Sequence, residues 1–142
     1  MGLRRKSREL ALQFLYGHDF QKCSCAPEAV AESLDVFCQV FETNKRALPY
    51  GSELVQGLCK YRDGIDELIA KHSHNWRVER MSVVDRNILR IAVYEMEYGR
   101  DVPNQVAINE ALEIAKRYSV KESIAFINGI LDSVQAMLVS KQ

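Results

Sequence analysis

The densest group of side chains that could do chemistry lies at the amino terminus. Arg4, Arg5, Lys6 and Arg8 supply four cations before the first acidic residue, Glu9. Guanidinium and ammonium groups neutralise phosphates, and the arginine plane also stacks on bases, so this run fits a nucleic-acid ligand. Short basic runs at chain ends are also common as solvated faces, and composition alone supports both interpretations equally.

The rest of the chain exerts no overall attraction on a polyanion. The 142 residues include 19 basic and 19 acidic ones, so the four cations of the amino-terminal run leave 15 basic against 19 acidic residues elsewhere. Any polyanion site must therefore come from local clustering. Tyr16, two to three helical turns beyond the run, adds a ring on which a base could stack.

Sulfur and imidazole groups are present, but their spacing does not predict a metal site. Zinc sites usually offer two ligand pairs, with two to four residues separating the members of each pair, and the intervals here are unrelated to that pattern. We therefore expect buried or idle cysteines, no metal and no cofactor. The candidate ligands considered are Cys23, Cys25, Cys38, Cys59, His18, His72 and His74.

Catalytic signatures are missing from the sequence. It has no Gly-rich phosphate loop, no Gly-x-Ser-x-Gly elbow and no two-histidine metalloprotease motif. Asp63, Asp66 and Glu67 have the spacing of helix-surface charges. A small helical chain also leaves little room for a concave pocket, so we expect no catalytic residues and no enzyme activity.

The cysteine content and the distribution of charge predict a cytoplasmic protein. Four irregularly spaced cysteines are too few to cross-link a chain of this size, and no secretory leader is apparent, which fits a reducing compartment. Charged residues interrupt the apolar stretches, so we expect no helix that spans a membrane.

Apolar residues recur at helical spacing along most of the chain, and alternating runs typical of strands are almost absent. Two cap signals mark helix starts: Ser82 with Asp85, and Ser119 with Glu122 as a full capping box. In the long third helix, Gly57 or Gly64 is expected to mark a bend or a close crossing. The predicted helices run from the start to Gly17, from Pro27 to Phe41, from about Ser52 to His72, from Ser82 to Gly99, from Pro103 to Tyr118, and from Ser119 onward.

This pattern predicts an all-α fold of six to seven helices, arranged as two three-helix groupings that share one core within a single domain of residues 1–142. Three helices precede Trp76 and three follow it. The 47% content of hydrophobic residues suffices for a sizeable core. Because Trp76 is the single tryptophan, we expect it to anchor the connection between the groupings in the core.

Five segments, in order along the chain, resemble the NusB family of transcription antitermination factors. The resemblance covers nearly the whole chain and is strongest over residues 81–132. The matching segments are RRKSRELALQFLY at 4–16, DRNILRIAVYE at 85–95, DVP at 101–103, VAINEA at 106–111 and FINGILD at 126–132.

The resemblance implies the NusB fold and a scaffold that binds the single-stranded boxA element of nascent ribosomal-RNA leader transcripts. It also implies pairing with NusE, a small-subunit ribosomal protein, within the antitermination complex of RNA polymerase. Carried over by position, the expected RNA-binding residues are Arg4, Arg5, Lys6, Arg8, Tyr16, Glu122 and Phe126.

For NusE, the resemblance points to Asp85 and Arg86 at the start of a helix, with Trp76 nearby, although Arg86 could serve either interface. Glu122 could tune RNA affinity or only complete its predicted capping box with Ser119. Two alternatives remain: a relative of the domains fused to rRNA cytosine methyltransferases, and a helical adaptor that binds proteins or rRNA-modification machinery without recognising boxA. The sequence leaves a monomer and a homodimer both open.

Overall fold

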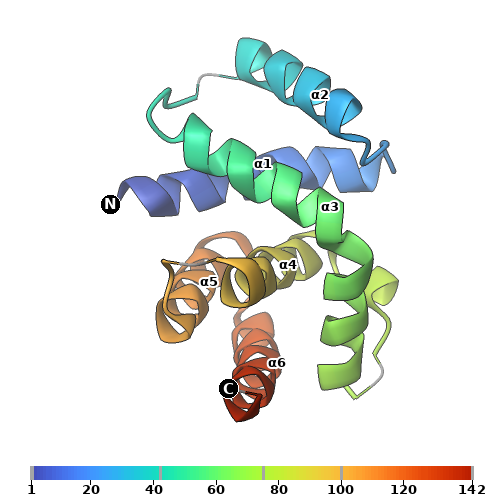
Figure 1. The fold of residues 1–142 in the computed structure, drawn as a ribbon, viewed down its shortest axis with the longest axis vertical. Helices are drawn as coiled ribbons and strands as arrows, with labels where there is room; N and C mark the ends of the chain where they lie inside the picture. Colours follow the sequence, from blue (N-terminus) through green and yellow to red (C-terminus); the bar gives the residue numbers. More distant parts are fainter. Residues whose placement is uncertain (1, 42, 75, 100, 142) are drawn as a thin grey trace. The chain divides into compact units, whose positions relative to one another are not determined.

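The computed structural model describes residues 2–41, 43–74, 76–99 and 101–141, and these residues form helices and connections without a strand. The prediction of an all-α fold of six to seven helices is confirmed, with six α-helices among the described residues. The elements are α1 (Leu3–Phe20), α2 (Pro27–Val40), α3 (Leu48–His72), the 3₁₀ turn η1 (Val78–Arg80), α4 (Val83–Tyr98), α5 (Asn104–Tyr118) and α6 (Lys121–Ser140) (Figure 1).

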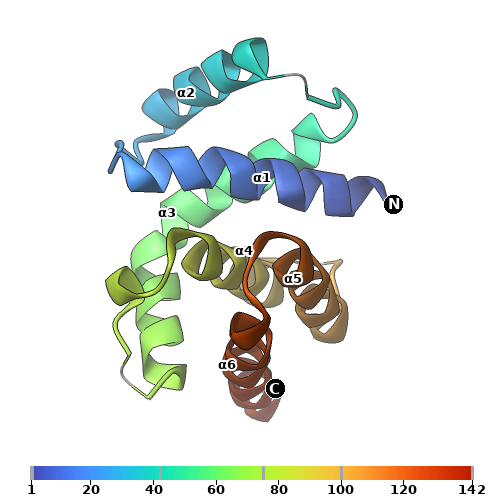
Figure 2. The ribbon, with the colours of Figure 1, turned by 180° about the vertical axis from the view of Figure 1, so that it is seen from behind.

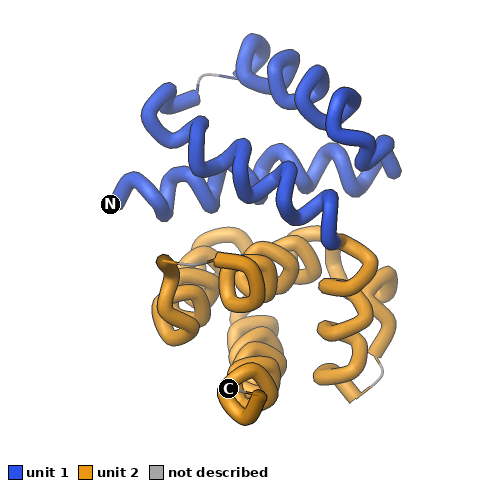
Figure 3. The backbone as a smooth tube through the Cα atoms, in the orientation of Figure 1, with its two compact units in different colours: residues 1–61 blue, residues 62–142 orange. Residues whose placement is uncertain are grey.

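The chain divides into two compact units, residues 1–61 and residues 62–142 (Figure 3). The first unit contains α1, α2 and the first half of α3, and the second contains the rest of α3 with η1, α4, α5 and α6. The division therefore falls inside α3 and not at Trp76, where the sequence placed it. The expectation of a single domain with one shared core stays a prediction.

Helix α1 continues past Gly17, where the sequence predicted its end. It ends because Lys22 adopts a left-handed conformation with a φ of 54°. This allows the Lys22 amide to donate to the Asp19 carbonyl and the Cys23 amide to donate to the His18 carbonyl, both at 3.0 Å. These two bonds form a Schellman motif, which satisfies the last carbonyls of the helix and reverses the chain.

Helices α1 and α3 approach each other closely at Gly51, which is buried. The hydroxyl of Ser7 donates to the carbonyl of Ala47 at 2.9 Å. A Cβ atom on Gly51 would lie 3.1 Å from Cδ2 of Leu10 and 3.3 Å from the carbonyl oxygen of Ser7. The missing side chain of Gly51 therefore allows this approach.

Helix α3 begins at Leu48, earlier than the predicted start near Ser52. Pro49 lies in its first turn, where a missing N–H removes no helical hydrogen bond. The close crossing expected at Gly57 or Gly64 is not at Gly64, because no atom would lie within 4 Å of a Cβ there. The alternative expectation, a bend at one of these two glycines, stays a prediction.

Helix α2 packs on α1 through Phe14 and Phe37, whose rings meet edge to face with centroids 5.7 Å apart. Val30 and Leu34 are buried. Phe41, the predicted last residue of this helix, follows the end of α2 and is 56% exposed.

In the second unit, α4, α5 and α6 pack against one another (Figure 2). The predicted cap at Ser82 is confirmed, because its hydroxyl accepts a hydrogen bond from the amide of Asp85 at 3.0 Å. The carboxylate of Asp85 is buried and accepts hydrogen bonds from the hydroxyls of Ser119 and Ser123, the second at 2.6 Å. Asp85 thus ties the start of α4 to the start of α6.

This arrangement corrects the prediction of a capping box at Ser119 and Glu122. The N-cap of α6 is Val120, which makes no side-chain cap. Ser119 lies one residue before this N-cap, so its side chain does not stand where a capping box requires it, and its hydroxyl donates to Asp85.

A partly buried ion pair joins the second half of α3 to α4. Nε of Arg90 lies 2.7 Å from Oδ1 of Asp66, and Nη2 of Arg90 lies 2.9 Å from Oδ2. Nη1 of Arg90 also donates to Oδ1 of Asn87 at 3.1 Å. The prediction that Asp66 is a plain helix-surface charge was wrong, since it receives a bidentate contact from a buried guanidinium.

Helix α6 is long and apolar enough, by length and composition, to cross a membrane. Asp132 alone interrupts the stretch between Ser123 and Ser140, so charge does not by itself exclude a membrane-spanning helix there, contrary to the expectation. One such helix is weak evidence, since core helices share these properties. Leu131 and Val134 have no exposed surface, which fits a packed helix of the second unit.

We expect Asp85→Ala to lower the free energy of unfolding by about 3 kcal/mol, because two hydroxyl donors lose a charged acceptor. Chemical denaturation of the full chain measures this change. Asp132→Ala, at an exposed position of α6, should change stability by less than about 0.5 kcal/mol. Equal effects of the two substitutions would contradict the structural role of Asp85.

The close approach at Gly51 gives a second stability prediction. Gly51→Val should lower the free energy of unfolding by about 1–3 kcal/mol through overpacking. Gly64→Ala, in the same helix with open space around it, should raise that energy by up to about 1 kcal/mol through helix propensity. Thermal unfolding of both variants checks the contrast, and a stabilised Gly51→Val would refute it.

Candidate nucleic-acid interface

The first two turns of α1 carry the predicted basic residues. Arg4 and Lys6 are exposed and Arg5 is half-buried. No acidic side chain lies in the first turn of the helix. The positive end of the helix dipole therefore adds to the charge of these three accessible cations.

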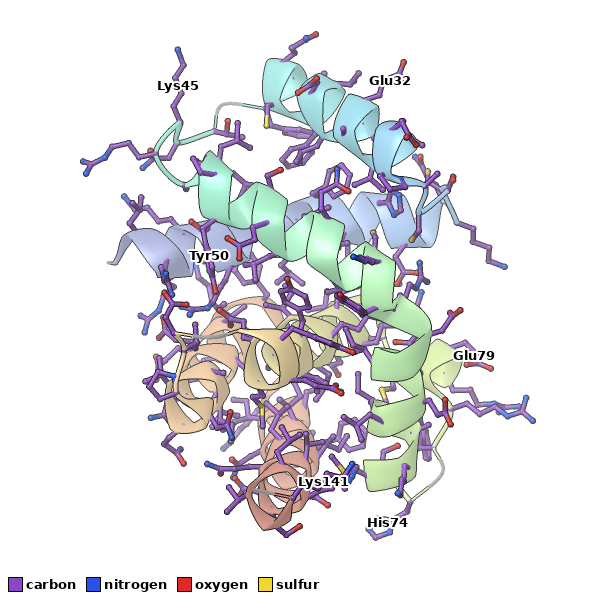
Figure 4. All side chains as sticks on the ribbon, viewed as in Figure 1. Glu32, Lys45, Tyr50, His74, Glu79 and Lys141 are labelled. Atoms are coloured by element: carbon purple, nitrogen blue, oxygen red, sulfur yellow. The ribbon has the colours of Figure 1, made fainter. Side chains whose placement is uncertain are left out.

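Tyr50 lies in the first turn of α3, where Figure 4 labels it. Its ring contacts two of the arginines. Cζ of Arg4 lies 4.4 Å from the centroid of the Tyr50 ring, and Cζ of Arg8 lies 5.9 Å from it. Both distances fall within the range of cation–π attraction. Because Arg4 remains exposed, the ring restrains its guanidinium without covering it. Sequence reasoning missed Tyr50, which lies in a segment predicted to break the helices.

The structure corrects the placement of Arg8. The sequence put it on a solvated basic face, but only 3% of its surface is exposed. Arg8 follows Arg4 by one helical turn, so both side chains lie on the side of α1 that contacts Tyr50. Its predicted contact with RNA stays a prediction, while its observed position is that of a packed side chain.

Tyr16 extends the accessible surface toward the other end of α1. It is 48% exposed, and its ring stacks on that of Phe20 with centroids 6.3 Å apart and an angle of 9° between the planes. Arg5 and Tyr16 are eleven residues apart, so they project from the same side of the helix, about 16 Å from each other along its axis. Phe20, which is 68% exposed, was missed because the helix was expected to end at Gly17.

A groove of about 640 Å³ lies between α1 and α2 in the first unit. Its exposed apolar side chains include Val36, Val40 and Phe41. The expectation that the chain leaves little room for a concave pocket was therefore wrong. The residues that line the groove are Gln13, Phe14, Tyr16, Gly17, His18, Gln21, Cys23, Glu32, Ser33, Val36, Phe37, Val40 and Phe41.

The two RNA-binding residues predicted near the carboxyl end lie on α6, in the second unit. Glu122 and Phe126 are one helical turn apart and both are exposed, Phe126 by 37% of its surface. With Val120 as the N-cap of α6, the capping-box role of Glu122 is removed. Its carboxylate still lies in the first turn, where it complements the helix dipole.

The residues predicted to contact a protein partner differ in accessibility. Asp85 is buried, and Arg86 is half-buried with Nη1 3.4 Å from the carbonyl of Met81. Trp76 is 55% exposed, so its expected role as a core anchor was wrong. Its neighbours along the chain are polar, a signal that could have predicted exposure.

His72, at the end of α3, is a structural group of the second unit. Its Nδ1 lies 2.6 Å from the hydroxyl oxygen of Ser133 on α6. Burial, and to a smaller extent the charge of Lys71, lowers the pKa of His72 below its ordinary value. The neutral ring is therefore favoured in the folded protein.

Residues 5–136 match the family model described as "NusB family". The chain belongs to the NusB family. The transcription antitermination protein NusB of Trichlorobacter lovleyi is 48% identical over 136 residues, which cover 96% of this chain and 92% of that relative.

Solved structures of NusB proteins agree with this fold. The T. maritima NusB structure is 35% identical, with a TM-score of 0.79, and the match covers 94% of this chain and 90% of that one. A structure of antitermination factors NusB and NusE in complex with dsRNA has a TM-score of 0.82, with 96% and 98% coverage. At 24% identity, it shows the fold alone. The predicted NusB fold is confirmed.

Because Arg8 is buried and Arg4 is exposed, their substitutions should differ in their effect on the free energy of unfolding. We expect Arg8→Ala to lower the free energy of unfolding by about 2 kcal/mol, because a buried side chain and its contacts are lost. Arg4→Ala should cost no more than about 1 kcal/mol, the value of an exposed cation–π contact. Denaturant titrations of both variants make the comparison, and an unchanged stability of Arg8→Ala would contradict the observed packing.

Proposed function

We propose that this NusB-family chain is a transcription antitermination factor that binds boxA-type RNA in nascent rRNA leader transcripts. The observation that carries the proposal is the exposed basic turn at the start of α1, whose Arg4 is restrained by the ring of Tyr50. Cations held in place lose less freedom on binding phosphates than freely moving ones. Arg4, Arg5 and Lys6 are proposed as the main contacts, with Arg8 supporting them.

Aromatic stacking would add affinity to these charge contacts. Tyr16 is exposed on the side of α1 that also carries Arg5, and a stacked base contributes about 1–3 kcal/mol in single-stranded complexes. Phe126 and Glu122 on α6 are proposed as further RNA contacts, where a carboxylate can accept hydrogen bonds from base edges.

The proposed protein partner is NusE, the small-subunit ribosomal protein, within the antitermination complex of RNA polymerase. Trp76 is the most accessible of the residues proposed for this contact, and exposed tryptophans often dominate binding energy at interfaces. Arg86 would contribute from its half-buried position, and Asp85 would act by fixing the start of α4. We infer a cytoplasmic protein that works by binding and not by catalysis.

An adaptor that binds only proteins is the second candidate, favoured by the exposed apolar side chains around the groove between α1 and α2. Such an adaptor requires no affinity for RNA. The dependence of RNA binding on salt therefore distinguishes the two candidates.

We expect the full chain to bind a boxA-like oligonucleotide more tightly than a scrambled one, and more tightly still with NusE. The logarithm of its affinity should fall with the logarithm of salt concentration by about 0.7 per phosphate contact. Arg4→Ala and Lys6→Ala should each reduce that slope by about 0.7, because each removes one such contact. Fluorescence anisotropy at several salt concentrations measures these slopes.

Lys141→Ala, which removes an exposed cation after the end of α6, is the matched control and should leave the slope unchanged. Binding of RNA that is insensitive to Arg4→Ala and Lys6→Ala would refute the proposed surface. An absence of RNA binding with and without NusE would favour the adaptor.

A further inference from the structure

Three potential metal ligands, distant in the sequence, meet in the first unit. His18 comes from the last turn of α1, Cys25 from the connection before α2, and Cys59 from α3. One ring nitrogen of His18 and the Sγ atoms of Cys25 and Cys59 all lie within 4.8 Å of one another. His18 and Cys59 are buried and Cys25 is half-buried.

The ring of His18 is arranged as a metal ligand would be. Its Nε2 lies 2.9 Å from the carbonyl oxygen of Ser24, and because a carbonyl can only accept, Nε2 carries the hydrogen. The neutral ring then has its lone pair on Nδ1, which is buried and has no hydrogen-bond partner among the described residues. Metal-bound histidines commonly donate their other N–H to a backbone carbonyl in this way.

The surrounding backbone fixes this arrangement. The Schellman motif that ends α1 turns the chain back, so that the carbonyl of Ser24 reaches the ring of His18. Phe14 stacks on the same ring with centroids 5.4 Å apart. His18 is 5% exposed, so a lone pair without a partner is costly there unless a ligand satisfies it.

We propose that Nδ1 of His18, Sγ of Cys25 and Sγ of Cys59 bind one Zn²⁺ ion, with a water molecule as the fourth ligand. Two thiolates and an imidazole form a donor set that zinc takes in tetrahedral geometry, with bonds of about 2.3 Å to sulfur and about 2.1 Å to nitrogen. Both thiols lose their protons on binding, so each bound ion releases two protons and its double charge is neutralised.

The observed spread of the ligand atoms suits such an ion. In a tetrahedral site with these bond lengths, the ligand atoms lie about 3.4–3.8 Å from one another. The three ligand atoms here lie within 4.8 Å of one another, so each would move by no more than about 1 Å to bind one ion. Cys25 lies in a connection, where such a shift costs little. The sequence did not predict this site because its ligands are 7 and 34 residues apart, and only the fold brings them together.

Metal titration of the reduced, metal-stripped full chain tests the proposal. Competition with a chromogenic chelator should show one equivalent of Zn²⁺ bound, and Co²⁺ should produce a thiolate-to-cobalt charge-transfer band. Cys25→Ser and His18→Asn should each weaken Zn²⁺ binding by about 100-fold or more. Loss of a group that only hydrogen-bonds a metal ligand already costs about 10–100-fold in metal affinity, and loss of a ligand should cost at least as much. Cys23→Ser, two residues away in the same connection, is the matched control and should bind like the parent chain.

Circular dichroism shows which variants remain folded. Cys25 is only half-buried, so Cys25→Ser can decide the question even if Cys59→Ser unfolds. Absence of stoichiometric Zn²⁺ binding, or binding that Cys25→Ser leaves unchanged, would overturn the proposed site. Loss of binding in Cys23→Ser with retention in Cys25→Ser would do the same.

Discussion

The close approach of α1 and α3 at Gly51 is the constraint on which the candidate interface depends. Because Gly51 has no side chain, the hydroxyl of Ser7 reaches the carbonyl of Ala47, and the second turn of α1 is joined to the start of α3. Tyr50 precedes Gly51, so the same approach places its ring near Arg4 and Arg8. In this unit, the packing of α1 on α3 therefore also positions the arginines. A change that separates the two helices would also move Tyr50 away from Arg4 and Arg8.

Buried polar groups play the corresponding role in the second unit. The carboxylate of Asp85 receives hydroxyl hydrogen bonds from the start of α6, and Arg90 reaches across to Asp66 on α3. Hydrogen bonds to charged groups are among the stronger ones in proteins, and they fix orientation as well as adding stability. These contacts set the directions in which α4 and α6 present Arg86, Glu122 and Phe126.

Local signals in the sequence predicted much of this fold. The helical spacing of apolar residues, Pro27 at a helix start and the cap at Ser82 involve groups no more than four residues apart, and all three were correct. The capping box at Ser119 was wrong because the N-cap is Val120, one residue later, and the Ser119 hydroxyl contacts Asp85, 34 residues away. A single sequence contains no record of such a pairing.

The same distinction explains the candidate site. Composition located the basic run, but it could not show that Arg8 is buried or that Tyr50 lies beside it. The cluster of His18, Cys25 and Cys59 also depends on contacts between separate elements. Trp76 is a different case, since its polar neighbours in the sequence already indicated the exposure that the structure shows.

The start of α1, held against Tyr50, is proposed as the RNA-binding surface of a chain with no net charge. Backbone amide chemical shifts of the full chain, recorded as a boxA-like oligonucleotide is added, test it most directly. The largest changes should fall on residues 3–9 and on Tyr50. Saturable RNA binding that leaves those signals unmoved, with the changes confined to other helices, would contradict it.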